Sequence, residues 1–333
     1  MSERAESTQE TRPDSETRSD AFGRSAATLR RLFPTIVLLA LCLVFALASP
    51  RFFTVSNGLI VLQQATVLLV AAVGMTFVVM AGSIDLSVGA IVALAALTAA
   101  SFSDELGAAA VIPAVGVGLV AGLVNGVIVA KGKVPSFIAT MGAMVVYRGI
   151  VLMFTRGAPV SINDEGFLDA YSGRTFGIPH SVLIGLALAL VGLVILRKTV
   201  FGREVRAIGG GERVAMLTGI RIARVKIAMF ALLGLLCGIA GLLQSARAMA
   251  ATAQLGEGLE LDVIAAVVVG GSPLTGGIGS IGGTVLGVLI ITILSNGMNM
   301  IGVDPYLQNI IKGAVLIAAV FITIDRNKIG IIK

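Results

Sequence analysis

The chain has 333 residues, of which 56% are hydrophobic and 13% are charged, and it contains 41 glycines and no tryptophan. This balance excludes an ordinary soluble domain and is typical of a membrane protein with several spans. The net charge of +6 does not indicate nucleic-acid binding, because the basic residues follow the apolar runs and form no cluster on a soluble domain. Cys42 and Cys237 lie inside apolar runs, so we expect small core residues.

Residues 1–31 combine arginines, acids, Ser and Thr with few apolar groups, which predicts a disordered cytoplasmic tail. Arg30 and Arg31 directly precede the first apolar run and favour a cytoplasmic amino terminus. Ala46-Leu47-Ala48 resembles a signal-peptide cleavage site. However, the apolar run before it is longer than a usual signal core and follows a long charged tail, so we expect an uncleaved anchor.

Apolar runs recur along the rest of the chain, and each is long enough to cross a hydrocarbon layer of about 30 Å as a helix. Barrel strands are excluded because the runs do not alternate. We predict an all-α, polytopic transmembrane helical bundle over residues 32–326, followed by a cytoplasmic end at 327–333. The ten predicted spans are 32–49, 58–81, 87–102, 107–130, 134–155, 180–196, 227–246, 262–275, 281–300 and 306–324.

Ten crossings place 19 of the 25 Lys and Arg residues on the inner side of the membrane. They gather in the amino-terminal tail, at Lys131 and Lys133, in 197–226 and at the carboxyl end. Arg51, Arg156, Arg174 and Arg247 fall outside. Because positive charge is retained in the cytoplasm, this distribution predicts that both ends of the chain are cytoplasmic.

Two parts of the chain echo each other, which predicts an internal repeat. A glycine-rich sequence also produces such echoes by chance. The spans 87–102 and 262–275 are both short and border glycine clusters, so we expect helices broken inside the membrane. The paired landmarks are Ala81-Gly82-Ser83 with Gly270-Gly271-Ser272, Asn125-Gly126 with Asn296-Gly297, and Val134-Pro135 with Asp304-Pro305.

Asp85 lies in "AGSIDLSVG", between two apolar runs. Its carboxylate is predicted to accept hydrogen bonds from the first amides of a helix that begins near Leu86, since Asp and Ser are good N-caps. On one interpretation this cap organises a break that lines a pathway. The alternative is a purely structural cap that never contacts cargo.

Small residues repeat at helical spacing in two further spans. Gly118, Gly122 and Gly126 follow one another every four positions, as do Gly234 and Gly238. This spacing allows helix backbones to approach each other closely. We expect ordinary helix packing at these positions and draw nothing from them about the substrate.

Residues 197–226 form the longest predicted inner loop and hold eight basic residues against two acids. The run Gly209-Gly210-Gly211 is predicted to break the chain, and Glu212 to Leu217 to form a short helix with Val214 and Leu217 on one face. An exposed helix of this kind suits docking of a cytoplasmic partner. The alternative is a basic loop that lies on anionic lipid.

No motor or enzyme site is visible in the sequence. The glycine run at 270–283 lacks the Lys-Ser or Lys-Thr of a phosphate-binding loop, and there is no zinc-protease motif or cysteine pair. We therefore expect no catalytic residue, metal or cofactor, and we interpret His180 as an interfacial residue. Only Asp85, Arg148 and Lys312 are candidates for titratable groups along a path, which is too few for an ion-coupled carrier and favours energy supplied by another protein.

Four segments in order resemble the permeases of bacterial ABC importers for monosaccharides such as ribose, xylose, galactose and arabinose. The resemblance covers about residues 35–326. The segments are "GSIDLSVGA" at 82–90, "VPSFIATMGAMVVYRG" at 134–149, "FGREVRAIGGGERVAMLTGI" at 201–220 and "GEGLELDVIAAVVVGGSPLTGGIGSIGGTVLG" at 256–287.

The resemblance implies a subunit of the bacterial inner membrane that works as two permease copies, with ATP bound by a separate cytoplasmic ATPase and sugar delivered by a periplasmic binding protein. This chain has Gly211 and Val214 where the family usually has Asn and Ala, so the contact with the ATPase is expected to differ in detail. The predicted coupling residues are Gly209, Gly211, Glu212, Arg213, Ala215, Leu217 and Gly219.

A permease that receives sugar from a binding protein needs only weak affinity of its own, so small polar groups are expected along its path. Asn125 and Asn296 have the alternative of bonding between helices. Docking of the binding protein is assigned to Arg156, Arg174 and Arg247, with plain solvated charges as the alternative. The predicted path residues are Ser83, Asp85, Ser87, Asn125, Thr140 and Asn296.

Two other functions remain open at this point. One is a permease of the same ABC type for branched-chain amino acids or a sugar-derived signal, because lining residues do not encode the cargo. The other is an ion-coupled secondary carrier that needs no ATPase, against which the scarcity of ionisable residues in the spans argues.

Overall fold

The computed structural model describes residues 32–323, so the predicted tail at 1–31 and the predicted end at 327–333 lie outside the described residues. Within the described part, nearly all regular structure is helical, and the strands are two residues long. Six helical stretches there are long and apolar enough to cross a membrane. The prediction of an all-α, polytopic membrane fold is therefore confirmed.

The first described helix is Leu32–Ala48. Four short strands lie at one end of the bundle, namely β1 (Val160–Ser161), β2 (Arg174–Thr175), β3 (Ile178–Pro179) and β4 (Ala250–Ala251). The remaining helices are α2 (Val55–Met80), α3 (Val88–Leu106), the 3₁₀ turn η1 (Gly107–Ala110), α4 (Val111–Ala130), α5 (Ser136–Thr155), α6 (Glu165–Ser172), α7 (His180–Lys198), α8 (Val200–Gly210), α9 (Glu212–Leu217), α10 (Ile222–Ala248), α11 (Leu259–Val269), α12 (Ile281–Met300) and α13 (Pro305–Thr323).

Each predicted span contains a helix, but the prediction that both broken helices are short is half wrong. α11 has 11 residues and extends over only about 16 Å at 1.5 Å per residue. α3 has 19 residues and continues to Leu106 instead of ending near 102. The hydroxyl of Ser103 donates to the carbonyl of Ala100 at 2.8 Å, so this polar residue is satisfied without ending the helix.

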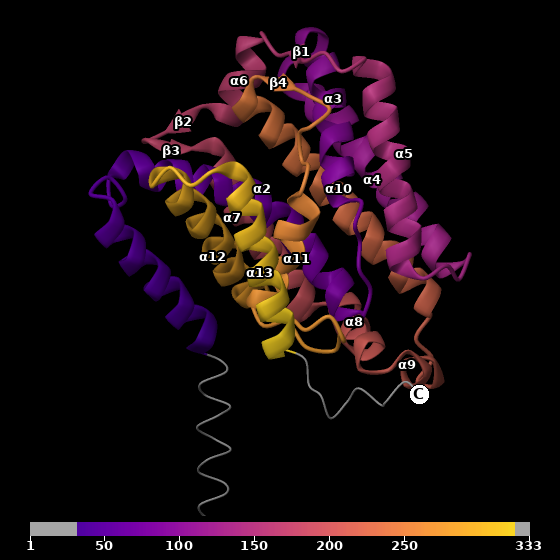
Figure 1. Ribbon diagram of the computed structural model, residues 1–333. Coiled ribbons are helices and arrows are strands. Elements are labelled where there is room, and N and C mark those ends of the chain that lie inside the picture. The colour runs from indigo at the N-terminus through magenta and orange to yellow at the C-terminus, as the bar shows by residue number, and fades with distance from the viewer. Residues whose placement is uncertain (1–31, 324–333) are drawn as a thin grey trace, which may run out of the picture.

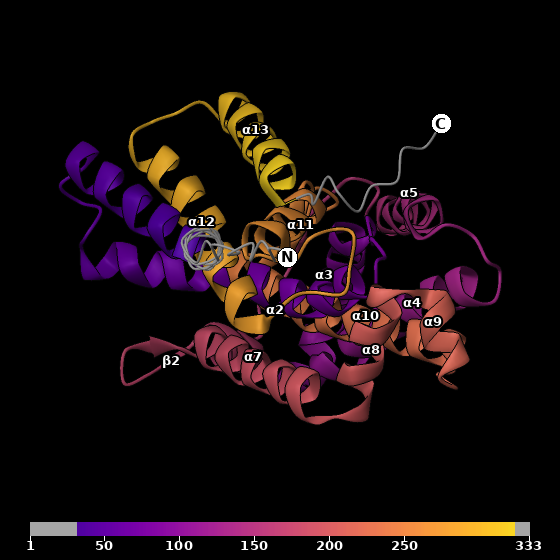
Figure 2. The same ribbon diagram turned by 90° about the horizontal axis from the view of Figure 1, so that it is seen from below.

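The centre of the bundle is built by α2, α3 and α10, which are largely buried, and α10 packs against both of the others (Figure 1). α4, α5 and α7 lie further out and expose many apolar side chains, as suits contact with lipid. The helix Leu32–Ala48 lies at one side of the bundle, where Phe45 packs against Ile293 and Leu294 of α12 (Figure 2).

α4 and α10 cross at glycines, so the predicted close packing of these positions is confirmed. A Cβ atom on Gly118 would lie 2.8 Å from the Cα of Gly238, and one on Gly122 would lie 2.9 Å from the Cα of Gly234. Gly126 is equally close to Ile227. Because no side chain fits between the two backbones, α4 is held directly against the central helix.

The two ends of the bundle differ. At one end lie α6 and the strands, where β1 pairs with β4 and so ties the segment after α5 to the segment after α10. At the other end lie α8 and α9 (Figure 1). The region 197–226, predicted as a loop, is therefore mostly helical, and α9 has the predicted bounds Glu212–Leu217.

Candidate functional site

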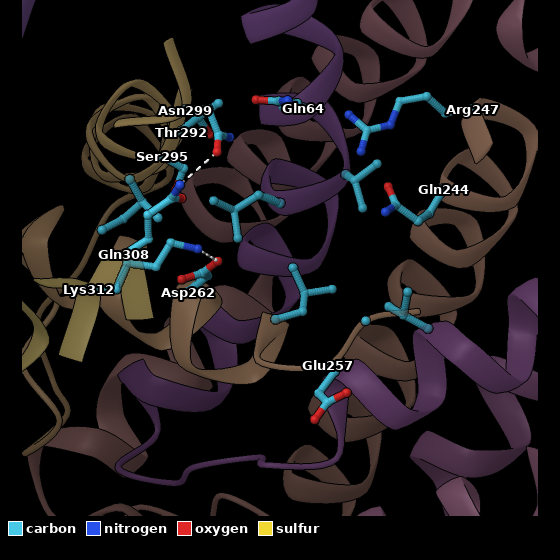
Figure 3. Close-up of a pocket in the computed structure, with 16 residues that line it drawn as sticks. Gln64, Gln244, Arg247, Glu257, Asp262, Thr292, Ser295, Asn299, Gln308 and Lys312 are labelled. Carbon is cyan, nitrogen blue, oxygen red and sulfur yellow. Dashed lines mark hydrogen bonds and ion pairs between the residues drawn. The ribbon is translucent and has the colours of Figure 1, made fainter. Parts of the chain in front are cut away.

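A cavity of about 290 Å³ lies among α2, α3, α10, α11, α12 and α13, in the middle of helices that are otherwise apolar (Figure 3). Four carboxamides line it, those of Gln64, Gln244, Asn299 and Gln308. Thr292 and Ser295 add hydroxyl groups. The charged residues in the lining are Arg247, Glu257, Asp262 and Lys312.

Helical spacing explains why these polar residues face one space. Thr292, Ser295 and Asn299 lie three and four positions apart along α12. Gln308 and Lys312 have the same relation on α13. Residues three or four positions apart share a helix face, so each helix presents a polar stripe inward and keeps its apolar faces for packing.

Two polar contacts hold α13 in the cavity wall. Lys312 Nζ lies 2.9 Å from Asp262 Oδ2, which joins α13 to the short helix α11. Gln308 Nε2 donates to Asn299 Oδ1 at 2.7 Å and to the carbonyl oxygen of Val303 at 2.9 Å, which joins α13 to α12 and to the turn between them. Both side-chain pairs are visible in Figure 3.

The sequence predictions missed most of this cavity. None of the six predicted path residues lines it, while Arg247 and Lys312 were singled out for other reasons. The available signal was the spacing of single polar residues inside apolar runs, such as 292, 295 and 299. That spacing becomes informative only once the fold shows that four other helices place polar residues in the same cavity.

The first helix break follows α2. The amides of Ala81, Gly82 and Ser83 donate to the carbonyls of Phe77, Val79 and Val78 respectively. Gly82 has φ +74°, a left-handed conformation that favours glycine. The chain then runs without regular structure to α3, which begins at Val88, two residues later than predicted.

Asp85 lies in this irregular segment and is fully buried. Its Oδ1 accepts from the amide of Ser87 at 2.7 Å and from the Ser87 hydroxyl at 2.6 Å. Its Oδ2 accepts from Asn125 Nδ2 at 3.3 Å. Of the predicted bonds from amides at the helix start, the one from Ser87, the residue before α3, is found, and no amide of α3 itself bonds to the carboxylate. The carboxylate has no contact with the central cavity.

The hydrogen-bonded group around Asp85 joins the irregular segment before α3 to two helices, α4 and α5. Asn125 of α4 also donates to Ser87 Oγ at 2.8 Å and accepts from the hydroxyl of Tyr147 at 3.0 Å. Thr140 of α5 accepts from the amide of Leu86 at 3.0 Å. This group, Asp85, Ser87, Asn125, Thr140 and Tyr147, is called the Asp85 network below.

The second helix break follows α11 and has the same hydrogen bonds as the first. The amides of Gly270, Gly271 and Ser272 donate to the carbonyls of Ala266, Val268 and Val267, and Gly271 has φ +92°. The surroundings differ, because Ser272 Oγ is buried without a hydrogen-bond partner.

The two remaining predicted path residues, Asn296 and Ser83, have different surroundings. Asn296 of α12 exchanges two hydrogen bonds with Asn57 of α2, at 3.0 and 3.1 Å, which favours the alternative of bonding between helices. Ser83 lines a second cavity, of about 680 Å³, near α9. Lys133, Glu212 and Lys226 border the same space.

α8 and α9 present the predicted coupling residues at one end of the bundle. Val214, Met216 and Leu217 have exposed side chains, whereas Ala215 is buried and fixes α9 to the body. Glu212 forms an ion pair with Lys226 at 2.7 Å. The predicted break in the run Gly209-Gly210-Gly211 is found at Gly211, because α8 includes the first two glycines and ends at Gly210.

The predicted docking arginines do not share one position. Arg156 and Arg174 are exposed at the end of the bundle opposite α9. Arg247 was expected in an outer loop, but α10 continues to Ala248 and Arg247 lines the central cavity. Its charge suits the last turn of a helix.

Arg148 and His180 hold loops at the strand end of the bundle. The guanidinium of Arg148 donates to the carbonyls of Ala253 and Leu255, between β4 and α11. The ring of His180 bonds to Thr175 Oγ1 and to the carbonyl of Asp169. Residues 32–323 contain no group of three His, Cys, Asp or Glu side chains that suits a metal ion.

Comparisons with known proteins place the chain among transport permeases. The chain is 42% identical to the ribose import permease of Escherichia coli K12, over 86% of this chain and 91% of that protein. It is 40% identical to the ribose import permease of Bacillus subtilis, over 90% and 94%. It is 37% identical to an L-arabinose ABC transporter permease of Azospirillum brasilense, over 86% and 85%.

No solved structure matches the chain significantly. The family model described as the permease component of branched-chain amino acid transport systems matches residues 57–320. This match includes both helix breaks, the central cavity and α8 to α10. The chain therefore belongs to this family of transport-system permease components.

Proposed function

We propose that the chain is the membrane permease subunit of an ATP-driven importer for a monosaccharide. The proposal rests first on near full-length similarity, of 37 to 42%, to permeases named for ribose and L-arabinose. The family description names branched-chain amino acids, but these relatives favour sugar. The transport-permease family also makes an enzyme or a self-contained ion-coupled carrier the less favoured assignment.

The chemistry of the central cavity supports a neutral, hydroxyl-rich cargo. Each carboxamide offers both donors and an acceptor, which matches sugar hydroxyls that donate and accept. The two bases, Arg247 and Lys312, are balanced by Glu257 and Asp262, so the lining has no net charge to select an ion. A cavity of about 290 Å³ is at the small end of the usual range of about 300–1,000 Å³ for small-molecule sites.

Within this proposal, all ten predicted spans belong to the membrane domain of a bacterial cell membrane protein, and both ends are cytoplasmic. Lys131, Lys133 and the eight basic residues of 197–226 support this orientation, since their segments lie toward the end that carries α9. The shared hydrogen bonds after α2 and after α11 support an internal repeat.

The predicted partners take defined places on the molecule. A cytoplasmic ATPase binds the exposed side chains of Val214, Met216 and Leu217 on α9. A periplasmic sugar-binding protein docks near Arg156 and Arg174, and a second permease copy completes the transporter. Five of the six predicted path residues, all but Ser83, support the path by fixing its helices, while the carboxamides of the cavity contact the sugar.

Reconstitution tests the function. Proteoliposomes that contain the permease, its ATPase and its binding protein are expected to accumulate radiolabelled D-ribose, D-xylose or L-arabinose only when ATP is present. L-Leucine serves as the competing cargo. Accumulation of sugar by the permease alone under an ion gradient, or ATP-driven uptake of L-leucine and of no sugar, contradicts the proposal.

A matched pair of variants on α2 tests the cavity. Gln64 lines it and its neighbour Gln63 does not. Gln64→Leu removes a hydrogen-bonding group from the path and is expected to lower sugar uptake about 2- to 10-fold, the effect of one hydrogen bond. Gln63→Leu is expected to leave uptake unchanged. Equal uptake by both variants removes Gln64 from the path.

A further inference from the structure

Three backbone segments meet at one point between α9 and the two helix breaks, with no side chain between them. They are the end of α2 at Met80, the end of α8 at Gly209 and the turn after α11 at Gly276 and Gly277. The amide of Gly277 donates to the carbonyl of Met80 at 2.8 Å. This meeting point is called the glycine junction below.

Glycine is required in the junction because the space of a side chain is already occupied. A Cβ atom on Gly209 would overlap the carbonyl oxygen of Met80 and the amide nitrogen of Gly277. One on Gly276 would lie 2.8 Å from the amide nitrogen of Gly82. Gly277 is similarly close to Gly209, since its Cβ would lie 3.3 Å from the Gly209 carbonyl oxygen.

α8 is held firmly in the body along its length. Val205 and Ile208 are buried. Phe201 at its beginning stacks on Phe77 of α2, with ring centroids 5.8 Å apart. Arg206 donates to the carbonyl of Leu196 at 3.1 Å. Because packed interiors transmit displacement instead of absorbing it, a movement of α8 acts directly on Met80 and Gly277.

α9 follows α8 with only Gly211 between them. Its apolar side chains are exposed, with Leu217 79% accessible. A displacement of α9 by a bound partner is therefore passed to α8 through one residue, Gly211. We infer that the glycine junction is the place where movement of α8 and α9 is transmitted to both helix breaks, and that Gly209 is its central positioning residue.

This inference rests on the proposed function, in which the ATPase is the partner that moves α9. It adds the set of contacts that transmits this movement to the helices around the central cavity. The turn after α11 is hydrogen-bonded to the end of α2 through the amide of Gly277 and the carbonyl of Met80. One displacement of α8 thus changes the relation between the two breaks, and it moves α11, whose Asp262 lines the cavity.

The adjacent glycines of α8 provide a matched test. A Cβ on Gly210 would meet nothing within 4 Å, in contrast to Gly209. Both residues are in the last turn of α8, so Gly209→Ala and Gly210→Ala change helix propensity alike. The complex of permease and ATPase is reconstituted in lipid with the binding protein. Three quantities are measured, namely ATP hydrolysis, D-ribose uptake, and the hydrogen exchange of residues 273–279 with and without ATP and vanadate.

The wild-type complex and Gly210→Ala are expected to show an ATP-dependent change in exchange at 273–279. Gly209→Ala is expected to hydrolyse ATP at a similar rate, to lose that change, and to take up sugar about tenfold more slowly per ATP, within the range of coupling defects in packed networks. A Gly209→Ala complex that keeps both the exchange change and the uptake of the wild type overturns the inference.

If Gly209→Ala does not assemble, Gly277→Ala decides the question from the other side of the junction. Gly277 has φ +79° and Gly177 has φ +81°, but a Cβ on Gly177 would have open space. Gly177→Ala thus controls for backbone strain. If Gly277→Ala lowers sugar uptake per ATP and Gly177→Ala does not, the result supports the glycine junction. If both variants take up the same amount of sugar per ATP, the result contradicts it.

The readouts also separate the two proposals. The wild-type complex could show the ATP-dependent change in exchange at 273–279 and yet import no sugar. That result contradicts the proposed function but is consistent with the glycine junction. A complex that imports sugar while residues 273–279 do not respond to ATP keeps the function and contradicts the junction.

Discussion

The two helix breaks have the same backbone cap but are held in different ways. After α2, the amides of Ile84, Leu86 and Ser87 each bond to a buried or half-buried side chain, from Ser136, Thr140 and Asp85 respectively. After α11, the amides of Gly276 and Gly277 bond to backbone carbonyls. The loop there is half exposed, and Ile278 is 62% accessible.

This difference separates a fixed break from a movable one. The Asp85 network ties the first break to α4 and α5 by several directional bonds, so displacing it costs all of them together. The second break is held by glycine contacts and by the ion pair of α11 with α13. Regions with few buried side-chain contacts open most easily, so we assign the movement of a transport cycle to α11 and its turn.

The largest effect is expected from removing the centre of the Asp85 network. Asp85→Ala leaves the amide and hydroxyl of Ser87 and the carboxamide of Asn125 without this acceptor. At about 1–3 kcal/mol for each orphaned buried donor, stability is expected to fall by about 3 kcal/mol or more. Thermal unfolding in detergent, followed by a thiol-reactive dye at buried Cys237 in a Cys42→Ala background, measures the loss.

Asp85→Asn is the graded control for this change. It keeps an oxygen for the Ser87 amide but turns an NH₂ group toward the donor of Asn125, so an intermediate loss is expected. An Asp85→Ala protein that unfolds at the wild-type temperature contradicts the fixed nature of the first break.

A second effect concerns the support behind the first break. Gly118 and Gly116 both lie in α4, but a Cβ would meet α10 only at Gly118 and nothing within 4 Å at Gly116. Gly118→Ala is expected to cost about 1–3 kcal/mol through overpacking, while Gly116→Ala is expected to be neutral or slightly stabilising. The same thermal unfolding assay compares them, and equal melting temperatures rule out a tight α4–α10 contact.

A third, smaller effect tests the ion pair that joins α11, the helix before the second break, to α13. The Lys312–Asp262 pair is about one quarter exposed, with side-chain accessibilities of 24% and 23%, so solvent screens part of its strength. Lys312→Met is expected to cost about 1 kcal/mol. Asp262→Asn should cost a similar amount, and the double variant should lose less than the sum of the two. A strictly additive double variant shows that the pair does not couple α11 to α13.

The smallest effect distinguishes the two breaks most simply. Ser272 Oγ is buried and makes no hydrogen bond, whereas Ser87 Oγ takes part in two. Ser272→Ala is expected to be neutral or stabilising by up to about 1 kcal/mol, because an unpaired buried hydroxyl is costly. Ser87→Ala is expected to be destabilising. Melting temperatures in the opposite order refute the assignment of which break is held by side chains.

The sequence predicted the helices well, because long apolar runs and terminal signals such as Glu212 at the start of α9 act locally. It predicted α11 as short, but it ended α3 too early, since Ser103 satisfies its own hydroxyl inside the helix. It predicted a break in the run Gly209-Gly210-Gly211, which falls at Gly211, but it did not indicate any packing role for Gly209. Its role in packing depends on Met80 and Gly277, which are remote in sequence.

The candidate site was predicted only in part for a related reason. Asp85 and Asn125 were predicted as path residues, yet the fold places them in a network apart from the central cavity. Gln64, Gln244 and Gln308 are unremarkable as single polar residues in apolar runs. Their meeting depends on the tertiary arrangement of α2, α10 and α13, which local spacing does not encode.

The difference between the breaks is measured most directly by hydrogen exchange of the full chain in lipid nanodiscs, without partners. The amides of residues 84–87 are expected to exchange slowly, and those of 275–279 at least about tenfold faster, for a difference in opening free energy of about 1.4 kcal/mol or more. Equal rates, or faster exchange at 84–87, would contradict the assignment of the first break as fixed and the second as movable.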